Sequence, residues 1–318
     1  MKALVITRPG IIELREEPRP EDAGECLIRV LEAGICGTDL QLLEGYAEFT
    51  GIPGHEFVGV VEQAPEADSA WIGRRVVGEI NVGCRQCDWC ARGIKEHCAN
   101  RNVLGIRQHD GAFAEYLSLP AANLHAVPET MDDETAVFAE PVAAACRIFE
   151  QMTVDPQARV AIVGDGRMGL LVAQVLRTVA PDVTVLGRHE HKLAIARALG
   201  LSAERSDRSA PSSARFDIVV DVTGRPEGLR RALELVKPRG TVVMKSTFHG
   251  EAPVATWPVV VDEVTLVGSR CGPFRPALDL LASGAVEVKS LISRVARLDD
   301  YESAFAEARR ALKVLLEP

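Results

Sequence analysis

The sequence predicts an α/β fold built around a doubly wound parallel sheet. Its length, 318 residues, is typical of two domains rather than one. Between Val160 and Ser246, short runs of β-branched residues alternate with segments that have the apolar spacing of helices. Strands that alternate with helices fold into a mostly parallel sheet with helices on its faces. A glycine motif and a loop with four cysteines indicate what the fold carries.

The expected elements follow one another in a regular order. The chain opens with an apolar strand at 1–10, which ends in a turn at its proline and glycine. Further strands are expected at 160–163, 182–187, 216–224 and 240–246, and helices after the glycine motif, at 189–200 and at 226–236. This alternation is that of successive βαβ units.

Gly164, Gly166 and Gly169 form a G-x-G-x-x-G motif between the strand at 160–163 and the next helix. In this place the motif predicts dinucleotide binding. The first glycine makes the turn, the second lets a pyrophosphate approach the backbone, and the third lets the helix pack on the strand. The phosphates are expected at the helix N-terminus, beside Arg167 and Met168. A sheet of this topology without a cofactor is the alternative.

Composition argues against two classes of partner. The net charge is −9 at pH 7, whereas a protein that binds nucleic acid needs a basic face for the phosphates. No apolar run reaches the roughly 18 residues of a membrane-spanning helix. The N-terminal segment lacks the apolar core and cleavage site of a signal peptide. We therefore expect a cytoplasmic protein that binds neither nucleic acid nor membrane.

Four cysteines share one short loop, at Cys84, Cys87, Cys90 and Cys98. Disulfides are rare in the cytoplasm, and two bridges among cysteines this close in sequence would strain the loop. Thiolates at these spacings can surround a single ion, which predicts a structural zinc site that does no chemistry itself. A redox cluster is the alternative, and His97 could be the fourth zinc ligand instead of a cysteine.

A second set of metal ligands lies upstream, where Cys36 is followed by His55 and Glu56. Three protein ligands with one open position are typical of a catalytic zinc site. Thr38 and Asp39 come directly after the Cys-Gly pair. The threonine hydroxyl could bond a zinc-bound hydroxyl, and the aspartate could orient the histidine. A buried cysteine and a structural histidine without metal are the alternative.

Taken in order, these motifs resemble the medium-chain, zinc-dependent alcohol dehydrogenase family, and within it the polyol and threonine dehydrogenase branch. The resemblance covers nearly the whole chain. It rests on "GICGTDL", "GHEFVG", the four-cysteine loop, "GAFAEYLSLP", "EPVA", "GDGRMG", "DVTG" and "KVLL". No single piece is decisive, but the joint order is highly specific.

The resemblance implies a fold of two domains. A mainly β, GroES-like catalytic domain would take residues 1–142 and 271–318, and a Rossmann domain would take residues 143–270. A cleft between them would hold the zinc, the nicotinamide cofactor and a small-molecule alcohol, aldehyde or ketone. The implied activity is hydride transfer between a substrate carbon and the nicotinamide, with zinc as the Lewis acid.

The resemblance also assigns roles to single residues. Glu140, in "EPVA", takes the place of an acidic ligand at the catalytic zinc, and either Glu140 or Glu56 would bind directly. Thr223 and Lys313 match motifs expected to bind the cofactor. The proton relay ends in many relatives at a histidine. Here that place holds Gln41, which cannot accept a proton at neutral pH.

Cofactor choice is predicted at the end of the second strand of the sheet. NAD sites place an acid there to hold the ribose 2′-OH, whereas this chain has Gly187 followed by Arg188. Glycine leaves room for a 2′-phosphate, and arginine can bind it through two hydrogen bonds. We therefore predict a preference for NADP(H), with Arg188 as the main ligand and His189 or Lys192 assisting. The alternative is that Glu190 holds the ribose of NAD.

Other functions remain as alternatives. One is an NAD-dependent polyol or threonine-type dehydrogenase, and another is an inactive relative that binds the cofactor. Metal content distinguishes the inactive relative from the enzyme, because the enzyme would hold about two zinc ions per chain and the inactive relative one. A zinc ribbon that binds nucleic acid is disfavoured by the acidity. Family enzymes are dimers or tetramers, so we expect a homodimer or homotetramer, in which the strand at 263–269 could pair across a two-fold axis.

Overall fold

The computed structural model describes residues 1–21, 24–206, 215–247 and 251–318. It divides into two compact units. The first unit holds Met1–Glu140 and Leu291–Pro318, and the second holds Pro141–Ser290. The chain therefore leaves the first unit, forms the second and returns. Among the described residues, no helix is both long and apolar enough to cross a membrane.

The return to the first unit lies later than the sequence indicated. We expected it at residue 271, whereas the second unit extends to Ser290. The side chain of Gln174 is one of the contacts that hold this segment. It donates to the backbone carbonyl of Glu287 at 2.9 Å and accepts from the N–H of the same residue at 2.8 Å. The segment that follows residue 271, with α9 (Phe274–Ala282), is thereby held to the second unit.

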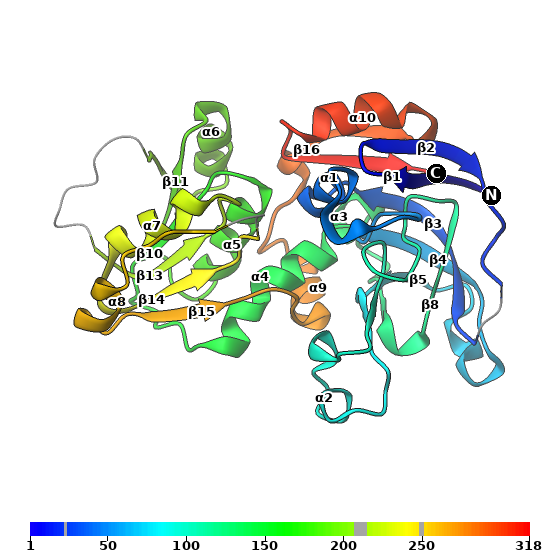
Figure 1. Cartoon of the computed structure of the whole chain (residues 1–318), viewed down its shortest axis with the longest axis horizontal. Coiled ribbons are helices and arrows are strands. Elements are labelled where there is room, and N and C mark those ends of the chain that lie inside the picture. The colour runs from blue at the N-terminus through cyan, green and yellow to red at the C-terminus, as the bar shows by residue number, and fades with distance from the viewer. Residues whose placement is uncertain (22–23, 207–214, 248–250) are drawn as a thin grey trace. The chain divides into compact units, whose positions relative to one another are not determined.

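The second unit is built on a six-stranded sheet whose strands all run parallel (Figure 1). The order across the sheet is β12-β11-β10-β13-β14-β15. The strands are β10 (Val160–Val163), β11 (Val183–Gly187), β12 (Ser202–Arg205), β13 (Phe216–Asp221), β14 (Val236–Met244) and β15 (Thr265–Gly268). This is the 3-2-1-4-5-6 order of a dinucleotide-binding sheet, with its reversal between β10 and β13. The predicted doubly wound parallel sheet is confirmed.

Helices connect these strands, as the alternating sequence pattern predicts. They are α5 (Arg167–Arg177), α6 (Glu190–Ala198), α7 (Pro226–Leu235) and α8 (Trp257–Val261), and α4 (Ala139–Gln151) precedes β10. Every residue of β10 is buried, as expected for a central strand of a sheet that is covered on both faces. Strand β12 is not predicted by the sequence pattern, because three of the four residues in "SAER" are polar and the strand lies at the edge of the sheet.

The first unit is mainly β. Its largest sheet has seven strands, in the order β16-β17-β3-β4-β5-β9, with β8 also paired to β3. The strands of the unit are β1 (Lys2–Arg8), β2 (Ile11–Glu16), β3 (Cys26–Gly34), β4 (Phe57–Gln63), β5 (Arg75–Gly78), β6 (Asn81–Val82), β7 (Asn102–Val103), β8 (Tyr116–Leu119), β9 (Leu124–Ala126), β16 (Ile292–Arg297) and β17 (Lys313–Glu317). Its helices are α1 (Gly37–Leu43), α2 (Asp88–Ala91), α3 (Asp133–Ala136) and α10 (Tyr301–Ala308). The loop that carries α2 stands away from the large sheet of this unit (Figure 1).

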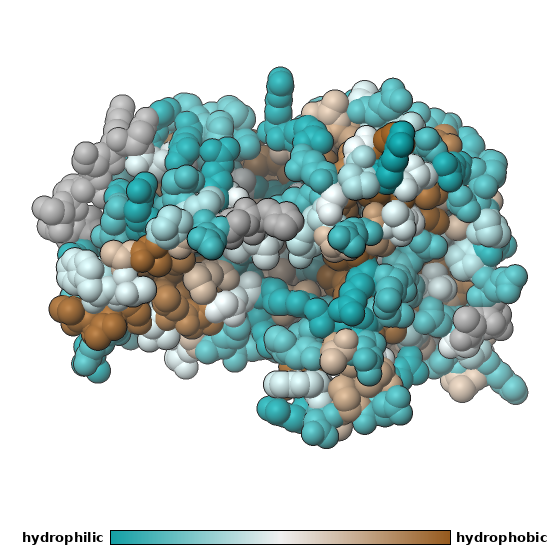
Figure 2. Space-filling model, in the orientation of Figure 1, coloured by the Kyte–Doolittle hydropathy of each residue, from teal (hydrophilic) through white to brown (hydrophobic). Residues whose placement is uncertain are grey.

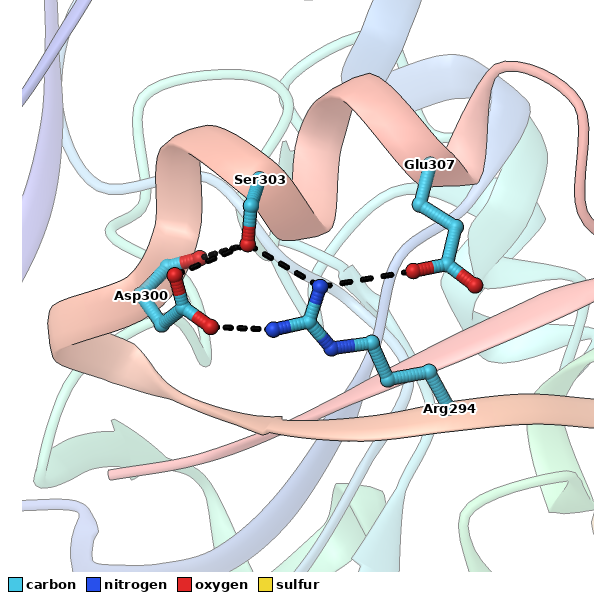
Figure 3. A network of polar contacts seen from close by, with 4 residues as sticks. All are labelled: Arg294, Asp300, Ser303 and Glu307. Carbon is cyan, nitrogen blue, oxygen red and sulfur yellow. Dashed lines mark hydrogen bonds and ion pairs between the residues drawn. The ribbon is translucent and has the colours of Figure 1, made fainter.

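Helix α10 is tied to β16 by one arginine (Figure 3). The guanidinium of Arg294 donates to Ser303 Oγ at 3.0 Å, lies 3.3 Å from the Glu307 carboxylate and pairs with Asp300. The hydroxyl of Ser303 donates in turn to Asp300 at 2.8 Å. This network holds α10 against β16, and the chain leads from α10 into β17, which begins at Lys313.

Candidate metal and nucleotide sites

Cys36 is held at the start of α1 by a residue one turn later. It is the N-cap of the helix, and its backbone N–H donates to Asp39 Oδ2 at 2.7 Å. A carboxylate at this helix position satisfies a backbone donor near the helix start. Thr38, in the same turn, places its hydroxyl oxygen 3.9 Å from Cys36 Sγ. The local sequence therefore fixes the thiol and the hydroxyl side by side.

His55 is positioned by the glycine before it and by Asp39. Gly54 has a φ of +99°, a left-handed conformation that favours glycine, and an added Cβ would lie 2.6 Å from the ring of Phe113. This turn delivers His55 to the interior, where it is 3% exposed. Its Nδ1 lies 3.2 Å from Asp39 Oδ1. Because this nitrogen faces a carboxylate, Nε2 is the ring nitrogen left for a metal.

Cys36, His55 and Glu56 bring a sulfur, a nitrogen and an oxygen within 4.8 Å of one another. A set of three such donors leaves the fourth position of a tetrahedral zinc site open, as catalytic sites do. The surroundings are negative. Burial alone would lower the pKa of His55, but the charges of Asp39 and Cys36 raise it well above its usual range. The same groups attract a cation, so the donor set fits zinc.

Lys313 also lies in this site, although we expected it to bind the cofactor. Its side chain is fully buried at the start of β17 and forms an ion pair with Glu56. Burial lowers the pKa of Lys313 to about 8, against the opposing effect of Cys36 and Asp39. Sequence reasoning missed the role of Gly34, where a Cβ would lie 2.5 Å from the lysine Nζ and 2.6 Å from the Glu56 carboxylate. The ion pair fits because that position has no side chain.

The four cysteines of the loop converge as well. Their sulfurs lie within 4.8 Å of one another. Cys87 is the N-cap of α2 and Cys90 lies within it, so one short helix sets two of the four donors. Cys98 is buried and accepts from the backbone N–H of Cys84 at 3.5 Å. Hydrogen bonds, first that from the backbone of Gln86, lower the pKa of Cys84 to about 6. Four thiols in this arrangement fit the closed donor set of a structural zinc site.

The glycine motif lies between β10 and α5. Gly164 has a φ of +127°, and a Cβ at Gly169 would lie 2.1 Å from the carbonyl oxygen of Gly164. Only glycine therefore lets the helix approach the strand this closely. Around Gly166, the N-cap of α5, no described atom lies within 4 Å of an added Cβ. The loop presents an open backbone at a helix N-terminus, which is how a pyrophosphate is bound.

Comparison with known proteins finds related families for both parts of the chain. The family model named "Alcohol dehydrogenase GroES-like domain" matches residues 22–129, and the model named "Zinc-binding dehydrogenase" matches residues 168–283. An L-threonine 3-dehydrogenase of Streptomyces avermitilis is 33% identical to this chain, over 100% of the chain and 99% of its own length. D-arabinitol dehydrogenase 1 of Uromyces fabae is 28% identical, over 100% of the chain and 97% of its own length.

The chain belongs to the medium-chain, zinc-dependent alcohol dehydrogenase family.

Solved structures of this family agree with the fold. A zinc-binding dehydrogenase of Sinorhizobium meliloti, bound to NADP, is 30% identical with a TM-score of 0.91, over 100% of this chain and 99% of that one. An Escherichia coli alcohol dehydrogenase complexed with NADH is 28% identical with a TM-score of 0.92, at the same coverages. The chain is thus a zinc-dependent NAD(P) alcohol dehydrogenase or reductase with a GroES-like and a Rossmann part. The family, fold and enzyme class predicted from the sequence are confirmed.

Two candidate ligands of the dehydrogenase lie outside the converging donors. Glu140 is in the first turn of α4 and is not in the set formed by Cys36, His55 and Glu56 within the described chain. This arrangement favours Glu56 over Glu140 as the direct ligand. His97 is exposed, with its ring 5.5 Å from that of Trp89 between centroids, and is not in the four-cysteine set.

The cofactor residues predicted for the dehydrogenase gather at one edge of the parallel sheet. Gly187 ends β11 and is followed by Arg188 and His189, and Lys192 lies in α6. Thr223 comes just after β13. The carboxyl ends of parallel strands meet at one edge, where the glycine motif also lies.

Sequence reasoning missed one residue at this edge. Asp165 stands between the first two glycines of the motif, and its side chain occupies the space beside Gly187. A Cβ at Gly187 would lie 2.5 Å from both Asp165 Cβ and Oδ2. The signal was present in the sequence as an acid inside "GDG", but only the structure shows which strand end it faces.

Proposed function

We propose that this chain oxidises a small alcohol, or reduces the matching aldehyde or ketone, with a catalytic zinc held by Cys36, His55 and Glu56. The observation that carries the proposal is the convergence of the three donor atoms within 4.8 Å, with Asp39 behind the histidine. When bound, zinc supplies a Lewis acid for the alcohol or carbonyl oxygen.

The residues around this donor set prepare it for proton transfer. Asp39 orients His55 and holds the backbone of Cys36. The Thr38 hydroxyl lies beside the donor set, where it can take the proton of an alcohol. Gln41 cannot take that proton further at neutral pH, so the relay ends in water, in the ribose of the nicotinamide or at another group.

Lys313 and Glu56 form a charge pair that offsets the charge of the buried Glu56 carboxylate before a metal binds. A single buried carboxylate is costly, and an adjacent ammonium offsets that cost. We propose that the lysine holds the carboxylate in place, and that Glu56 offers its remaining acceptor capacity to the metal.

A second zinc, with a structural role, is proposed at Cys84, Cys87, Cys90 and Cys98. The support is the closed set of four sulfurs on a short loop. Cysteines that hold metal rather than form disulfides suit a reducing compartment, so we also propose that the protein works in the cytoplasm.

The decisive experiment removes one catalytic ligand and measures zinc, folding and nucleotide binding together. His55→Ala is expected to abolish turnover and to lower bound zinc from about two ions per chain to about one. The variant is expected to melt as a folded protein and to keep its nucleotide affinity. Cys146→Ala, at a buried cysteine outside both sets, is the matched control. Near-normal turnover by a zinc-depleted His55→Ala enzyme would refute the assignment.

The same measurements address the alternative of an inactive relative. Such a chain would bind about one zinc, at the four-cysteine loop only, and would turn over no alcohol.

The named relatives include D-arabinitol, sorbitol and L-threonine dehydrogenases. We therefore propose a substrate with an alcohol group in a polyol or hydroxy amino acid. A panel of polyols, hydroxy amino acids and simple alcohols would identify it.

Cofactor choice depends on the end of β11. The sequence predicts NADP(H), on the strength of Gly187 and of an exposed Arg188, and one solved relative binds NADP. Another solved relative is complexed with NADH. The position of Asp165 beside Gly187 bears directly on this choice.

We propose that the protein is a homodimer or homotetramer. Strand β15 is the edge of its sheet, and an apolar patch covers α8 and β15 (Figure 2). Trp257, Val260, Val261 and Leu266 are exposed there. Light scattering of the intact protein tests this proposal. Val260→Glu is expected to shift the mass towards the monomer, whereas Ile72→Glu, at an exposed position in the first unit, is not.

A further inference from the structure

The space where a 2′-phosphate was expected is already occupied. The sequence alone suggests that glycine at the end of β11 leaves room for the phosphate of NADP. In the structure, the side chain of Asp165 fills that room, since a Cβ at Gly187 would lie 2.5 Å from Asp165 Cβ and Oδ2. Gly187 is therefore required by the aspartate, whether or not a phosphate binds.

The carboxylate of Asp165 takes the backbone N–H groups and the imidazole that a phosphate at this strand end could use. Its Oδ2 accepts from the backbone N–H groups of Arg188 and His189, each at 2.7 Å. The ring nitrogen Nδ1 of His189 lies 3.1 Å from both carboxylate oxygens. These N–H groups and this imidazole are the groups directly after the second strand. All of them already contact the Asp165 carboxylate.

Asp165 is ionised at neutral pH. Its side chain is buried, and burial would raise the pKa of this carboxyl, but hydrogen bonds from His189 and from the backbone of Arg188 lower it overall. A phosphate that approached the same strand end would meet a full negative charge, with the two backbone N–H groups and the His189 ring already used. A neutral hydroxyl would meet no such repulsion.

The carboxylate also keeps acceptor capacity for a hydroxyl. A carboxylate has about four lone-pair positions. Oδ2 uses two of them on backbone N–H groups, while Oδ1 contacts only the His189 ring within the described chain. An acid at the end of the second strand is the group that holds the ribose 2′-OH of NAD. Here an acid reaches the same place from the neighbouring glycine loop.

We propose that Asp165 is the specificity-determining residue of the nucleotide site, that it binds the adenosine ribose hydroxyls, and that the chain therefore prefers NAD(H) over NADP(H). This inference rests on the proposed function and reverses the preference predicted from Gly187 and Arg188. It assigns Arg188 a role through its backbone N–H and leaves its exposed side chain without a phosphate to bind.

The test isolates the 2′-phosphate from the rest of the cofactor. Adenosine 5′-monophosphate and adenosine 2′,5′-bisphosphate differ only in that group, and calorimetry measures both affinities without zinc or turnover. The intact protein is expected to bind the monophosphate at least tenfold more tightly, and NADH more tightly than NADPH by a similar factor. Tighter binding of the bisphosphate by the unaltered protein would overturn the proposal.

Variants then assign the effect to a residue. Asp165→Asn removes the charge and is expected to narrow the ratio of the two affinities at least tenfold. A loosened turn would weaken both ligands, so the ratio within one variant is the readout. Asp182→Asn removes an exposed acid just before β11 and is expected to leave the ratio unchanged. The role of Asp165 would be refuted if Asp165→Asn left the ratio of the two nucleotide affinities unchanged. It would also be refuted if Arg188→Ala, as a single substitution, abolished binding of the bisphosphate.

The result is separable from the proposed function. A protein that binds neither nucleotide, or binds them without zinc-dependent turnover, would contradict the dehydrogenase assignment. A zinc-dependent enzyme that prefers the 2′-phosphorylated ligand would contradict only the inference about Asp165.

Discussion

Glu32 is predicted to make the protein less stable as the pH rises. Its side chain lies in β3, 9% exposed, and its Oε2 has no hydrogen-bond partner within the described chain. Burial raises the pKa of this carboxyl to about 7, with further contributions from Asp133, Glu134, Glu317 and Asp132. These acids come from the α3 segment and from the end of β17. Ionised Glu32 is therefore disfavoured in the folded state.

The size and sign of the effect follow from this pKa. A folded-state pKa of about 7, against an ordinary 4.5, corresponds to about 3 kcal/mol, because each pH unit is worth about 1.4 kcal/mol. The folded value is the higher one. The stabilising contribution is thus fully present below pH 4.5 and is lost as the pH rises through about 7.

Glu32→Gln keeps the shape of the side chain and removes the charge. At pH 8 the variant is expected to be more stable than the unaltered protein by about 2 to 3 kcal/mol. At pH 5 the difference is expected to fall below about 1 kcal/mol. Urea unfolding at both pH values, with zinc present, measures the free energy of unfolding. Each variant is compared with the unaltered protein at the same pH, so that any loss of zinc at low pH cancels.

Glu66→Gln, at an exposed position in the same unit, is the control and is expected to change stability equally at both pH values. A Glu32→Gln variant whose stability difference is the same at pH 5 and pH 8 would show that the buried carboxyl titrates normally, and the reasoning would fail.

Three further predictions concern the metal sites. Cys87→Ser is expected to lose about one zinc per chain and to melt at a lower temperature, as metal analysis and calorimetry would show. Thr38→Val is expected to reduce kcat about a hundredfold or more, whereas Thr38→Ser stays near normal in steady-state assays. Lys313→Met leaves the Glu56 carboxylate buried and unpaired, so urea unfolding of the zinc-free protein is expected to show a loss of about 3 to 5 kcal/mol. The double change Lys313→Met with Glu56→Gln is expected to recover most of that loss. These predictions would be contradicted by a normal zinc content in Cys87→Ser or by a normal kcat in Thr38→Val. The third would be contradicted if the double variant were no more stable than Lys313→Met.

The sequence by itself determined those features that depend on short spacings. The four cysteines lie within one loop, so their spacing alone brings their sulfurs near a common point. Cys36 and Asp39 lie within one helical turn, and the turn geometry sets their contact. The glycine motif is also local, because its three glycines serve one turn and the helix that follows. The alternation of strands and helices likewise predicted the parallel sheet, since βαβ connections leave few other topologies.

Tertiary structure decided the contacts between distant segments. Lys313 meets Glu56 because β17 pairs with β3 in the register that places Leu315 opposite Gly34. A motif search sees a lysine near the C-terminus but not the register, so it could not place that ammonium against the carboxylate.

The nucleotide site shows the same limit. Gly187 has no side chain, and the sequence states only that a space exists beside it. What fills the space depends on the parallel pairing of β10 with β11, which aligns Val163 with Leu186 and sets the glycine loop against the next strand end. Asp165 reaches Arg188 and His189 because of that alignment. The sequence alone therefore does not show the role of such a glycine, because that role depends on which neighbouring side chain packs into the space beside it.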